Sequence, residues 1–285
     1  MRKTQNSSSR PNSSLVEAFV ARSGKAPGQT AQQIMEALVE GHSRRKAETL
    51  DERVQQFLRG RNIQIIEEQA DLDCDGLIEP LGSRYEDGFR VRLNTASTQV
   101  RQRFTLAHEA CHSLFYELVP EVKFVPHAPD EEEEWLCNFG AAALLIPGNA
   151  LRKKAKNVQP CLDSLYELAS EYRVSVKTML LRLRGLGLWA IELSMWHRMG
   201  NGTFALDRLY GGRQVDWEWT DEVVLKLAWQ RKGSTWGHTF VQYQDLRGIK
   251  RFKPVAYEVR RHSNGLVALW GKGIARQTPS VRRLF

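Results

Sequence analysis

Several features are scarce in this chain of 285 residues, and each scarcity argues against a class of protein. No run approaches about 18 consecutive apolar residues, the length that a membrane-spanning helix needs. Residues 1–14 are polar and serine-rich without an apolar core, so we expect a disordered tail rather than a secretory signal. The four cysteines include no C-x-x-C pair. This usage is typical of a reducing cytoplasm, where we expect the protein to act.

Acidic residues are scarce in the C-terminal third of the chain. Residues 189–285 hold 16 Lys and Arg but only 8 Asp and Glu, so the entire formal charge of +8 belongs to this region. Within it, residues 247–285 hold ten basic residues and the single acid Glu258. This balance favours an anionic partner, either nucleic acid or an acidic protein surface. A solvated basic surface without a partner is the alternative.

What the sequence does contain is an H-E-x-x-H pattern, formed by His108, Glu109 and His112. On a helix, residues four apart lie about one turn along and about 40° round, so both imidazoles can bind one metal ion. Glu109 lies beside them, where in the zincin arrangement it reaches a water rather than the metal. Apolar residues at helical spacing predict a separate buried stripe: Phe104, Ala107, Cys111, Leu114 and Leu118. The alternative is a surface helix with two solvated histidines.

A third metal ligand is expected downstream, because catalytic zinc usually has three protein ligands. Residues 130–134 are acidic and residues 135–146 are almost wholly apolar, which predicts a buried helix with an acidic first turn, ended by Pro147. Glu134 and Asn138 share one face of this helix. They are candidates for the third ligand and for a partner of a ligand histidine. The preceding three glutamates, Glu131, Glu132 and Glu133, are interpreted as partners of the helix dipole.

Residues 101–109 and 134–147 together resemble the ImmA/IrrE-type metallopeptidases, most closely the IrrE branch of Deinococcus radiation-response regulators. The resemblance extends over residues 85–188. It implies metal ligands at His108, His112 and Glu134, with Glu109 as the general base and zinc, or alternatively manganese, as the ion. Cys111 departs from the glycine that many members carry before the second histidine. Because it falls on the apolar stripe, we expect this departure to affect packing more than chemistry.

The resemblance also implies a function, namely a metal-dependent endopeptidase with a narrow protein substrate. The expected substrate is a helix-turn-helix transcriptional repressor, cut at one site to derepress stress-response or mobile-element genes. A second interpretation is a DNA-binding transcriptional regulator in which the metal site is structural or vestigial. The basic C-terminal region favours it, and so does a helix-turn-helix pattern in residues 162–187.

The helix-turn-helix pattern consists of one helix, a break at Arg173 and Val174, and a second helix capped by Ser175. By itself it could contact DNA through Lys177, Arg182 and Arg184. Similar helices occur in ImmA/IrrE-type peptidases as scaffold, which weakens the DNA interpretation.

The remaining segments mix helical and strand patterns. Helices are predicted at 15–22, around 34–39, at 50–58 and at 148–157, and strands at 63–66, 76–80 and 88–94. The last strand alternates Phe89, Val91 and Leu93 with polar residues. It is interpreted either as an edge strand that holds an extended substrate or as an interior strand. Ser97 or Thr98 can cap the helix that follows.

From residue 189 onward the chain turns to short alternating stretches, at 189–196, 215–219, 255–260 and 266–270, with Asn264 and Gly265 predicting a hairpin. Seven of the eight tryptophans lie here and are expected to fill a β-rich core, with base stacking as the alternative. The predicted fold class is α+β. Its parts are a tail (1–14), a zincin-like metallopeptidase domain (15–158), a helix-turn-helix-like segment (159–188) and a basic, Trp-rich C-terminal domain for sensing or partner binding (189–285).

Overall fold

The computed structural model describes residues 14–24, 28–42, 49–68, 74–82, 85–119, 130–210, 222–244 and 250–274. These residues form an α+β protein with two compact units, Met1–Pro147 and Gly148–Phe285. The predicted tail lies outside the described residues except for Ser14, and so does the strand predicted at 215–219. Among the described helices, none is long and apolar enough to cross a membrane.

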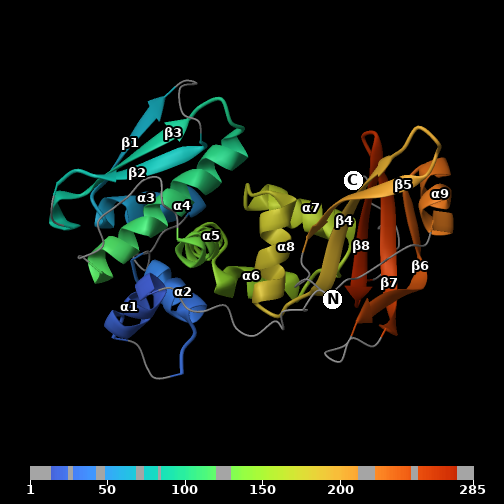
Figure 1. Ribbon diagram of the computed structural model, residues 1–285, viewed down its shortest axis with the longest axis horizontal. Helices are drawn as coiled ribbons and strands as arrows, with labels where there is room; N and C mark the ends of the chain where they lie inside the picture. Colours follow the sequence, from blue (N-terminus) through green and yellow to red (C-terminus); the bar gives the residue numbers. More distant parts are fainter. Residues whose placement is uncertain are drawn as a thin grey trace, which may run out of the picture. The chain divides into compact units, whose positions relative to one another are not determined.

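The first unit combines helices with a three-stranded sheet (Figure 1). Its described helices are α1 (Ser14–Arg22), α2 (Ala31–His42), α3 (Leu50–Gly60), α4 (Gln99–Leu118) and α5 (Glu131–Leu145), with a 3-10 turn at Tyr85–Asp87. Its strands are β1 (Ile63–Glu68), β2 (Gly76–Pro80) and β3 (Phe89–Asn94). The helices and strands predicted for this region are thereby confirmed, with helix ends that differ by a few residues.

Strand β3 is the central strand of this sheet, whose order is β1-β3-β2. It pairs parallel with β1 and antiparallel with β2. Phe89, Val91 and Leu93 are all buried, because their face packs into the core. The interior-strand alternative is therefore correct, and the prediction of β3 as a substrate-binding edge strand is wrong. The edge strand that contacts α4 is β2.

Helix α4 packs against β2 and β3 on one side and against α5 on the other. The Thr98 hydroxyl caps its N-terminus by accepting from the Arg101 backbone N–H, as the sequence predicts. Ala107, Cys111 and Leu114 are fully buried, so the predicted apolar stripe is real. The helix bearing the two histidines is thus held between two layers rather than exposed on the surface.

Two glycines allow the elements around α4 to approach it closely. A Cβ atom on Gly76 of β2 would collide with the side chain of Thr105. A Cβ atom on Gly140 of α5 would lie 2.8 Å from the Sγ of Cys111. Glycine removes both clashes, since it has no side chain to place at the contact. These contacts fix the distance of β2 and of α5 from the histidine-bearing helix.

Helix α5 begins with Asp130, whose carboxylate accepts from the backbone N–H groups of Glu132 and Glu133. Such a cap satisfies N–H groups that have no partner within the helix. Leu136 and Leu144 are buried, and the helix contacts α1, α2, α3 and α4. The predicted buried helix with an acidic first turn is confirmed, and packing from several sides fixes its rotation about its own axis.

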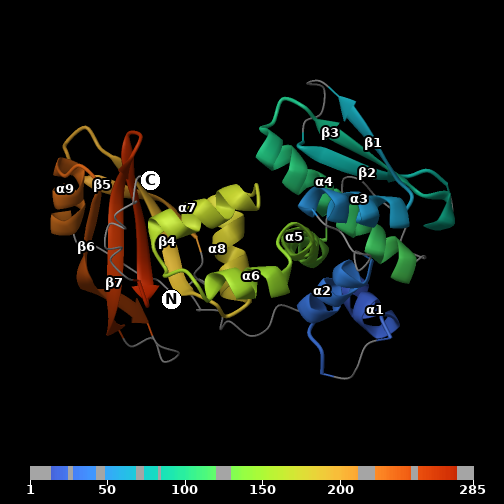
Figure 2. The ribbon, with the colours of Figure 1, turned by 180° about the vertical axis from the view of Figure 1, so that it is seen from behind.

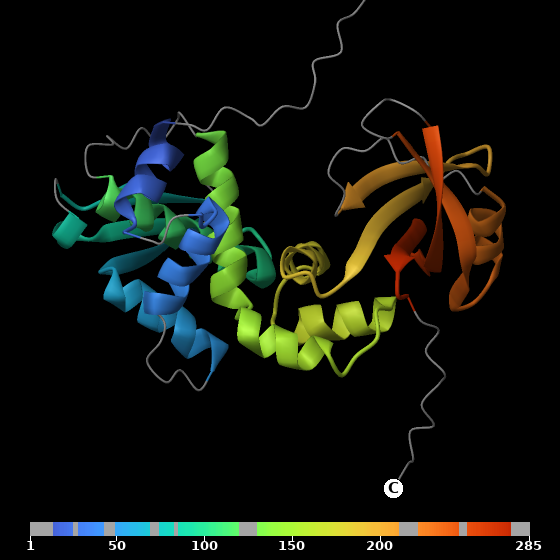
Figure 3. The same ribbon diagram turned by 90° about the horizontal axis from the view of Figure 1, so that it is seen from below.

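The second unit is built on a five-stranded antiparallel sheet with the order β5-β4-β8-β7-β6, whose twist is visible in Figure 3. Its described helices are α6 (Gly148–Ala155), α7 (Leu162–Glu171), α8 (Val176–Gly185) and α9 (Glu222–Gln230). Its strands are β4 (Ala190–Arg198), β5 (Phe204–Tyr210), β6 (Ser234–Gln244), β7 (Lys250–His262) and β8 (Gly265–Lys272). The predicted hairpin is confirmed, because His262 pairs with Gly265.

Helix α9 lies on one face of this sheet, and α7 and α8 lie on the side of the other face (Figure 2). On the α9 face, Val224 and Leu225 pack with Val255, Tyr257 and Val259 of β7. Trp189 and Trp270 are buried, whereas the other described tryptophans of the unit are partly buried. Trp270 belongs to the core cluster under α9, and Trp196 and Trp229 pack against that cluster. The expectation that tryptophans fill the core of this unit therefore holds for Trp270 and in part for Trp196 and Trp229.

A buried carboxylate joins α7 to the sheet. The side chain of Glu258 on β7 is fully buried. Its Oε2 accepts from the backbone N–H of Leu162 at 2.6 Å, and its Oε1 accepts from the Ser234 hydroxyl at 2.6 Å and from Arg260 at 3.0 Å. Arg260 also pairs with Asp163 at 2.6 Å. Each oxygen of Glu258 thus has a donor, which is what a buried charge requires.

The two helices predicted in residues 162–187 are present as α7 and α8, and Arg173 at the break has a positive φ of 51°. Ser175 caps α8 as predicted. Arg182, however, is buried, and Arg184 forms an ion pair with Glu192 on β4. Two of the three side chains expected to contact DNA are therefore engaged within the unit, because α8 turns them toward its own core.

Candidate metal centre

His108 and His112 come from successive turns of α4, and their side chains meet. Their Nε2 atoms lie 3.2 Å apart, and the ring centroids are 4.9 Å apart. His112 is buried and His108 is partly buried. The two histidines are therefore not solvated on a surface helix, and the helical spacing of four residues orients their Nε2 atoms toward a common point.

Glu134 on α5 brings a carboxylate to the same point. Its Oε2 lies 3.1 Å from the Nε2 of His108, and its Oε1 lies 3.5 Å from the Nε2 of His112. For tetrahedral zinc with bonds of about 2.0–2.1 Å, neighbouring ligand atoms are separated by about 3.3–3.4 Å. The three separations of 3.1–3.5 Å are close to the edges of such a tetrahedron.

The chemistry of this donor set fits a divalent cation. Two imidazoles and one carboxylate form the kind of set that binds zinc with a position left open. The carboxylate contributes only acceptors, and each neutral imidazole also has one acceptor nitrogen, so a cation between these atoms would satisfy all three. The Nδ1 atom of His108 is buried without a hydrogen-bond partner among the described residues. His108 therefore differs from a structural core histidine, in which both ring nitrogens usually have hydrogen-bond partners.

A fourth residue, which the sequence interpretation missed, completes the cluster. Glu133 Oε1 lies 2.7 Å from the Nδ1 of His112. A carboxylate in this position fixes the tautomer and the ring orientation of a histidine that binds metal through Nε2. The available signal was its place four residues before Cys137, which puts it on the core-facing side of α5.

Asn138 does not make the contact that the sequence led us to expect. Its amide is exposed and donates to the backbone carbonyl of Glu134 at 2.9 Å. An amide four residues after a helical carbonyl can satisfy itself locally in this way. The partner of the histidine is Glu133 instead, which the sequence interpretation had assigned only to the helix dipole.

Glu109 lies at the boundary between α4 and β2. Burial raises the pKa of its carboxyl, although the neighbouring His112 and His108 act in the opposite direction. The backbone N–H of Ile78 on β2 donates to this carboxylate. A carboxyl with a raised pKa holds a proton more tightly than a solvated one does, a property suited to a general base.

The pKa values of Glu134 and His112 are shifted by their neighbours in the cluster. The hydrogen bond to His108 holds the pKa of Glu134 below its usual range. Burial lowers the pKa of His112, but the hydrogen bond to Glu133 and the charges of Glu133, Glu109 and Glu134 together raise it overall. These directions describe a carboxylate that stays ionised beside two imidazoles.

A second set of donor atoms, from His112, Glu133 and Cys137, also lies within 4.8 Å of one another. Complete burial raises the pKa of the Cys137 thiol well above its usual range. Metals bind the thiolate, which burial in this position disfavours. His112 also uses its Nδ1 for Glu133. The set formed by His108, His112 and Glu134 is therefore the better candidate.

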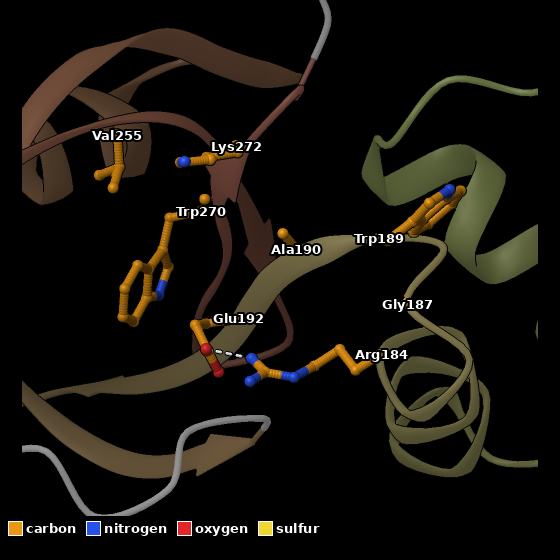
Figure 4. A pocket seen from close by; sticks show the side chains of 9 residues that line it. Arg184, Gly187, Trp189, Ala190, Glu192, Val255, Trp270 and Lys272 are labelled. Atoms are coloured by element: carbon orange, nitrogen blue, oxygen red, sulfur yellow. Dashed lines mark ion pairs between the residues drawn. The ribbon is translucent and has the colours of Figure 1, made fainter.

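The second unit contains a cavity of about 390 Å³, shown in Figure 4. It is lined by nine residues that include Trp189, Trp270 and Lys272, and Arg184 pairs with Glu192 across it. The charges of Arg184 and Glu192 neutralise each other, and Lys272 adds a further positive charge to the lining. None of the metal-centre residues lines this cavity, which therefore offers no support for catalysis.

Comparison with known proteins links the first candidate site to a family. Residues 69–184 match the family model of the IrrE N-terminal-like domain, Peptidase_M78. The chain is 36% identical over 116 residues to the radiation response metalloprotease IrrE of Deinococcus deserti, covering 36% of this chain and 40% of that protein. It is 33% identical over 98 residues to the protein of the same name from Deinococcus radiodurans, covering 33% and 30%.

The matched segment therefore spans less than half of either relative. A solved structure of a Mycobacterium tuberculosis transcriptional regulator is similar in fold, with a TM-score of 0.50 at 15% identity, covering 90% of this chain and 80% of that one. At this identity the likeness concerns the fold alone. All the residues of the candidate metal centre fall within the segment that matches the family model.

Proposed function

We propose that this chain is a metal-dependent endopeptidase of the ImmA/IrrE type, because residues 69–184 match the IrrE N-terminal-like domain and part of the chain is similar to two IrrE metalloproteases. Its metal ligands would be His108, His112 and Glu134. The observation that carries the proposal is the convergence of their donor atoms at 3.1–3.5 Å from one another. Zinc suits two imidazoles and one carboxylate best, and manganese is the second candidate.

A divalent ion held by these residues would polarise the scissile carbonyl and acidify a nearby water. Glu109 accepts the proton of the attacking water and passes it to the leaving amine. The hydrogen bond from the Ile78 backbone holds the Glu109 carboxylate toward the edge of β2. Glu133 keeps His112 in the tautomer whose Nε2 is free to bind the ion.

The substrate would bind along β2, the edge strand beside α4. Among the described strands, β2 pairs only with β3, and we propose that an extended peptide pairs with its other edge. Pairing there would bring a peptide next to Glu109, because Ile78 of this strand contacts that side chain. The edge-strand mechanism expected from the sequence is thus transferred from β3 to β2.

We assign the substrate class from the family resemblance, as a helix-turn-helix transcriptional repressor cut at one site. Cleavage would derepress stress-response or mobile-element genes. Direct DNA reading through α8 is less well supported, since Arg182 is buried and Arg184 is paired with Glu192. An anionic partner for the basic C-terminal region stays a prediction from its net charge.

The proposal is tested by incubating the full chain with the helix-turn-helix repressor encoded beside it, with zinc or manganese added. We expect two fragments of defined mass, and none after chelation of the metal. Mass spectrometry of the products identifies the cut bond. An intact repressor after long incubation with either ion, from protein shown to hold metal, would argue against this substrate class. Many products of varied mass would indicate general proteolysis instead.

A further inference from the structure

Two arginines of the second unit meet on a single tryptophan ring. The guanidinium carbon of Arg261 on β7 lies 4.0 Å from the centroid of the Trp229 ring on α9. The guanidinium carbon of Arg198 on β4 lies 5.3 Å from the same ring centroid. Both distances are within the reach of about 6 Å that is typical of cation–π contacts. We call these three residues the Arg198/Trp229/Arg261 cluster.

Strand alternation explains why both arginines point toward α9. Tyr257 and Val259 of β7 belong to the core cluster under α9. Arg261 follows Val259 by two residues, so its side chain lies on the same face of the sheet. On β4, Trp196 packs against that core cluster, and Arg198 follows it by two residues. Both arginines thus come from the face that α9 covers, and both are exposed beyond its core.

The indole between the two arginines is held in place by the sheet. Trp229 is partly buried and packs against the core cluster under α9. Its ring centroid lies 5.8 Å from that of Phe204 on β5, the residue that pairs with Arg198. A guanidinium stacked on a fixed ring has lost part of its freedom before any ligand binds. The cluster therefore presents preorganised N–H donors to the solvent.

Neither guanidinium has an acidic partner among the described residues. In that part of the chain, Arg198 and Arg261 form no ion pair and no side-chain hydrogen bond, and each contacts the Trp229 ring instead. Other described arginines of the unit do pair with acids: Arg184 with Glu192, Arg208 with Asp207 and Arg260 with Asp163. The cluster thus gathers two positive charges that the described chain leaves unbalanced.

The helix end beside the cluster offsets only a small part of this charge. Trp229 is the last residue but one of α9, and a helix C-terminus carries a negative charge of about half an elementary charge. Two like charges near one ring also repel each other, although the ring attracts each of them. An anion bound by both guanidiniums would balance the charge that remains.

A phosphate group matches this cluster better than a single carboxylate does. A guanidinium binds either group through paired N–H donors. A carboxylate supplies one negative charge, whereas a phosphate monoester carries about −1.5 to −2 at pH 7. A nucleic acid backbone supplies one negative charge on each successive phosphate. Both phosphate sources can therefore balance two guanidiniums.

We propose that the Arg198/Trp229/Arg261 cluster is a phosphate-binding site, where both guanidiniums donate N–H groups to phosphate oxygens. The phosphate belongs either to a nucleotide or to a nucleic acid backbone, and the two sources are separated by the experiment. Trp229 orients the arginines and does not stack a base, because Arg261 already lies over its ring. The site is independent of the proposed peptidase centre and uses no residue of it.

The test measures binding to the full chain at about 50 mM salt, where phosphate contacts are weakly screened. The two probes are adenosine monophosphate, followed by calorimetry beside adenosine, and a labelled DNA duplex, followed by anisotropy. Arg198→Gln and Arg261→Gln should each weaken binding by about three- to tenfold, as expected for exposed charge-assisted contacts. Arg208→Gln is the matched control. It removes the same charge from the same sheet, and Arg208 is an exposed partner of Asp207, so binding should not change.

The two probes identify the source of the phosphate. Binding of adenosine monophosphate, but not of adenosine, would assign a nucleotide. Binding of the duplex alone would assign a nucleic acid backbone. In that case each Arg→Gln variant of the cluster should reduce the slope of the logarithm of affinity against the logarithm of salt by about 1. Arg261→Lys keeps the charge and the apolar stem but lacks the fork, so it should bind more tightly than Arg261→Gln and less tightly than the wild type.

The proposal is overturned if the wild type binds neither adenosine monophosphate nor the duplex. Equal affinity of the Arg198→Gln, Arg261→Gln and Arg208→Gln variants would also overturn it, because the bound phosphate would then lie elsewhere. Succinate bound as tightly as adenosine monophosphate would contradict the preference for phosphate. Metal content and repressor cleavage are separate readouts, so failure here leaves the peptidase proposal standing.

Discussion

The carboxylates of Glu258 and Glu134 differ in what surrounds them. Around Glu258, each carboxylate oxygen accepts from a donor supplied by the chain itself, and Arg260 balances the charge. Around Glu134, the neighbours of the carboxylate are the Nε2 atoms of His108 and His112, which lie 3.2 Å from each other. The first cluster is complete as a structural element. The second gathers acceptor atoms that only a cation, or protons, can satisfy together.

The difference shows how a functional site can be told from a structural one by counting donors. A buried acid is tolerated where its lone pairs are used, as at Glu258. Where several acceptor atoms gather around one point, a bound cation can satisfy them together. The packing of α4 between β2 and α5 holds these atoms in place. The comparison gives expected outcomes for changes in each cluster.

The largest effect is expected at Glu109. Glu109→Gln should lower the rate of substrate cleavage by about 10²–10⁴-fold, because the amide cannot accept the proton. Bound metal should stay at the wild-type level, since this side chain is not one of the three converging ligands. Glu131→Gln, at the exposed start of α5, is the control and should cleave normally. A Gln variant that cleaves at the wild-type rate would remove Glu109 from its assigned role.

A smaller effect separates Glu133 from Asn138. Glu133→Ala should lower zinc affinity by about 10–100-fold, because His112 loses the carboxylate that orients its ring. Asn138→Ala should change it by less than about twofold, since its amide bonds only to the helix backbone. Competition with a chromogenic zinc chelator measures both. Equal losses of zinc affinity in the two variants would mean that the general integrity of α5, rather than the contact of Glu133 with His112, sets the zinc affinity.

The smallest effect is expected at Glu258, whose carboxylate oxygens all have donors within the chain. Glu258→Gln should lower the free energy of unfolding of the second unit by about 1–3 kcal/mol, because an amide cannot satisfy all the donors around it. Glu222→Gln, an exposed partner of Lys226, should change it by less than about 1 kcal/mol. Chemical denaturation measures both, with and without a chelator. If the loss of unfolding free energy in Glu258→Gln changed when a chelator was added, the Glu258 cluster would not be independent of the metal centre, contrary to this account.

Local patterns made much of this predictable from the sequence. The spacing of His108 and His112 is a property of one helix, and so is the apolar stripe on its other side. The acidic start and apolar body of α5 likewise indicated a buried helix near Pro147. These inferences needed only residues within a few turns of one another. The place of Glu134 at the start of this helix made it a candidate third ligand, and the family resemblance implied that it has this role.

Long-range packing decided what the sequence left open or misassigned. Glu133 faces His112 because the contact of Gly140 with Cys111 helps set the rotation of α5. The spacing of Glu133 from Cys137 indicates only the core-facing side of the helix, not which histidine it meets. The position of β3 between β1 and β2 depends on pairing between distant segments. Arg182 was a candidate DNA contact, but it is buried, because α8 turns it inward. Each case required tertiary contacts that a pattern along the chain does not contain.

Elemental analysis of the purified protein tests the central claim most directly, with the wild type measured beside His112→Ala, Glu134→Ala and the control Glu131→Ala. We predict about one equivalent of zinc or manganese in the wild type and the control, and its loss in the other two variants. Metal retained in both His112→Ala and Glu134→Ala would contradict the assigned ligands. No metal in any of the four proteins, even after reconstitution, would contradict the metallopeptidase account itself.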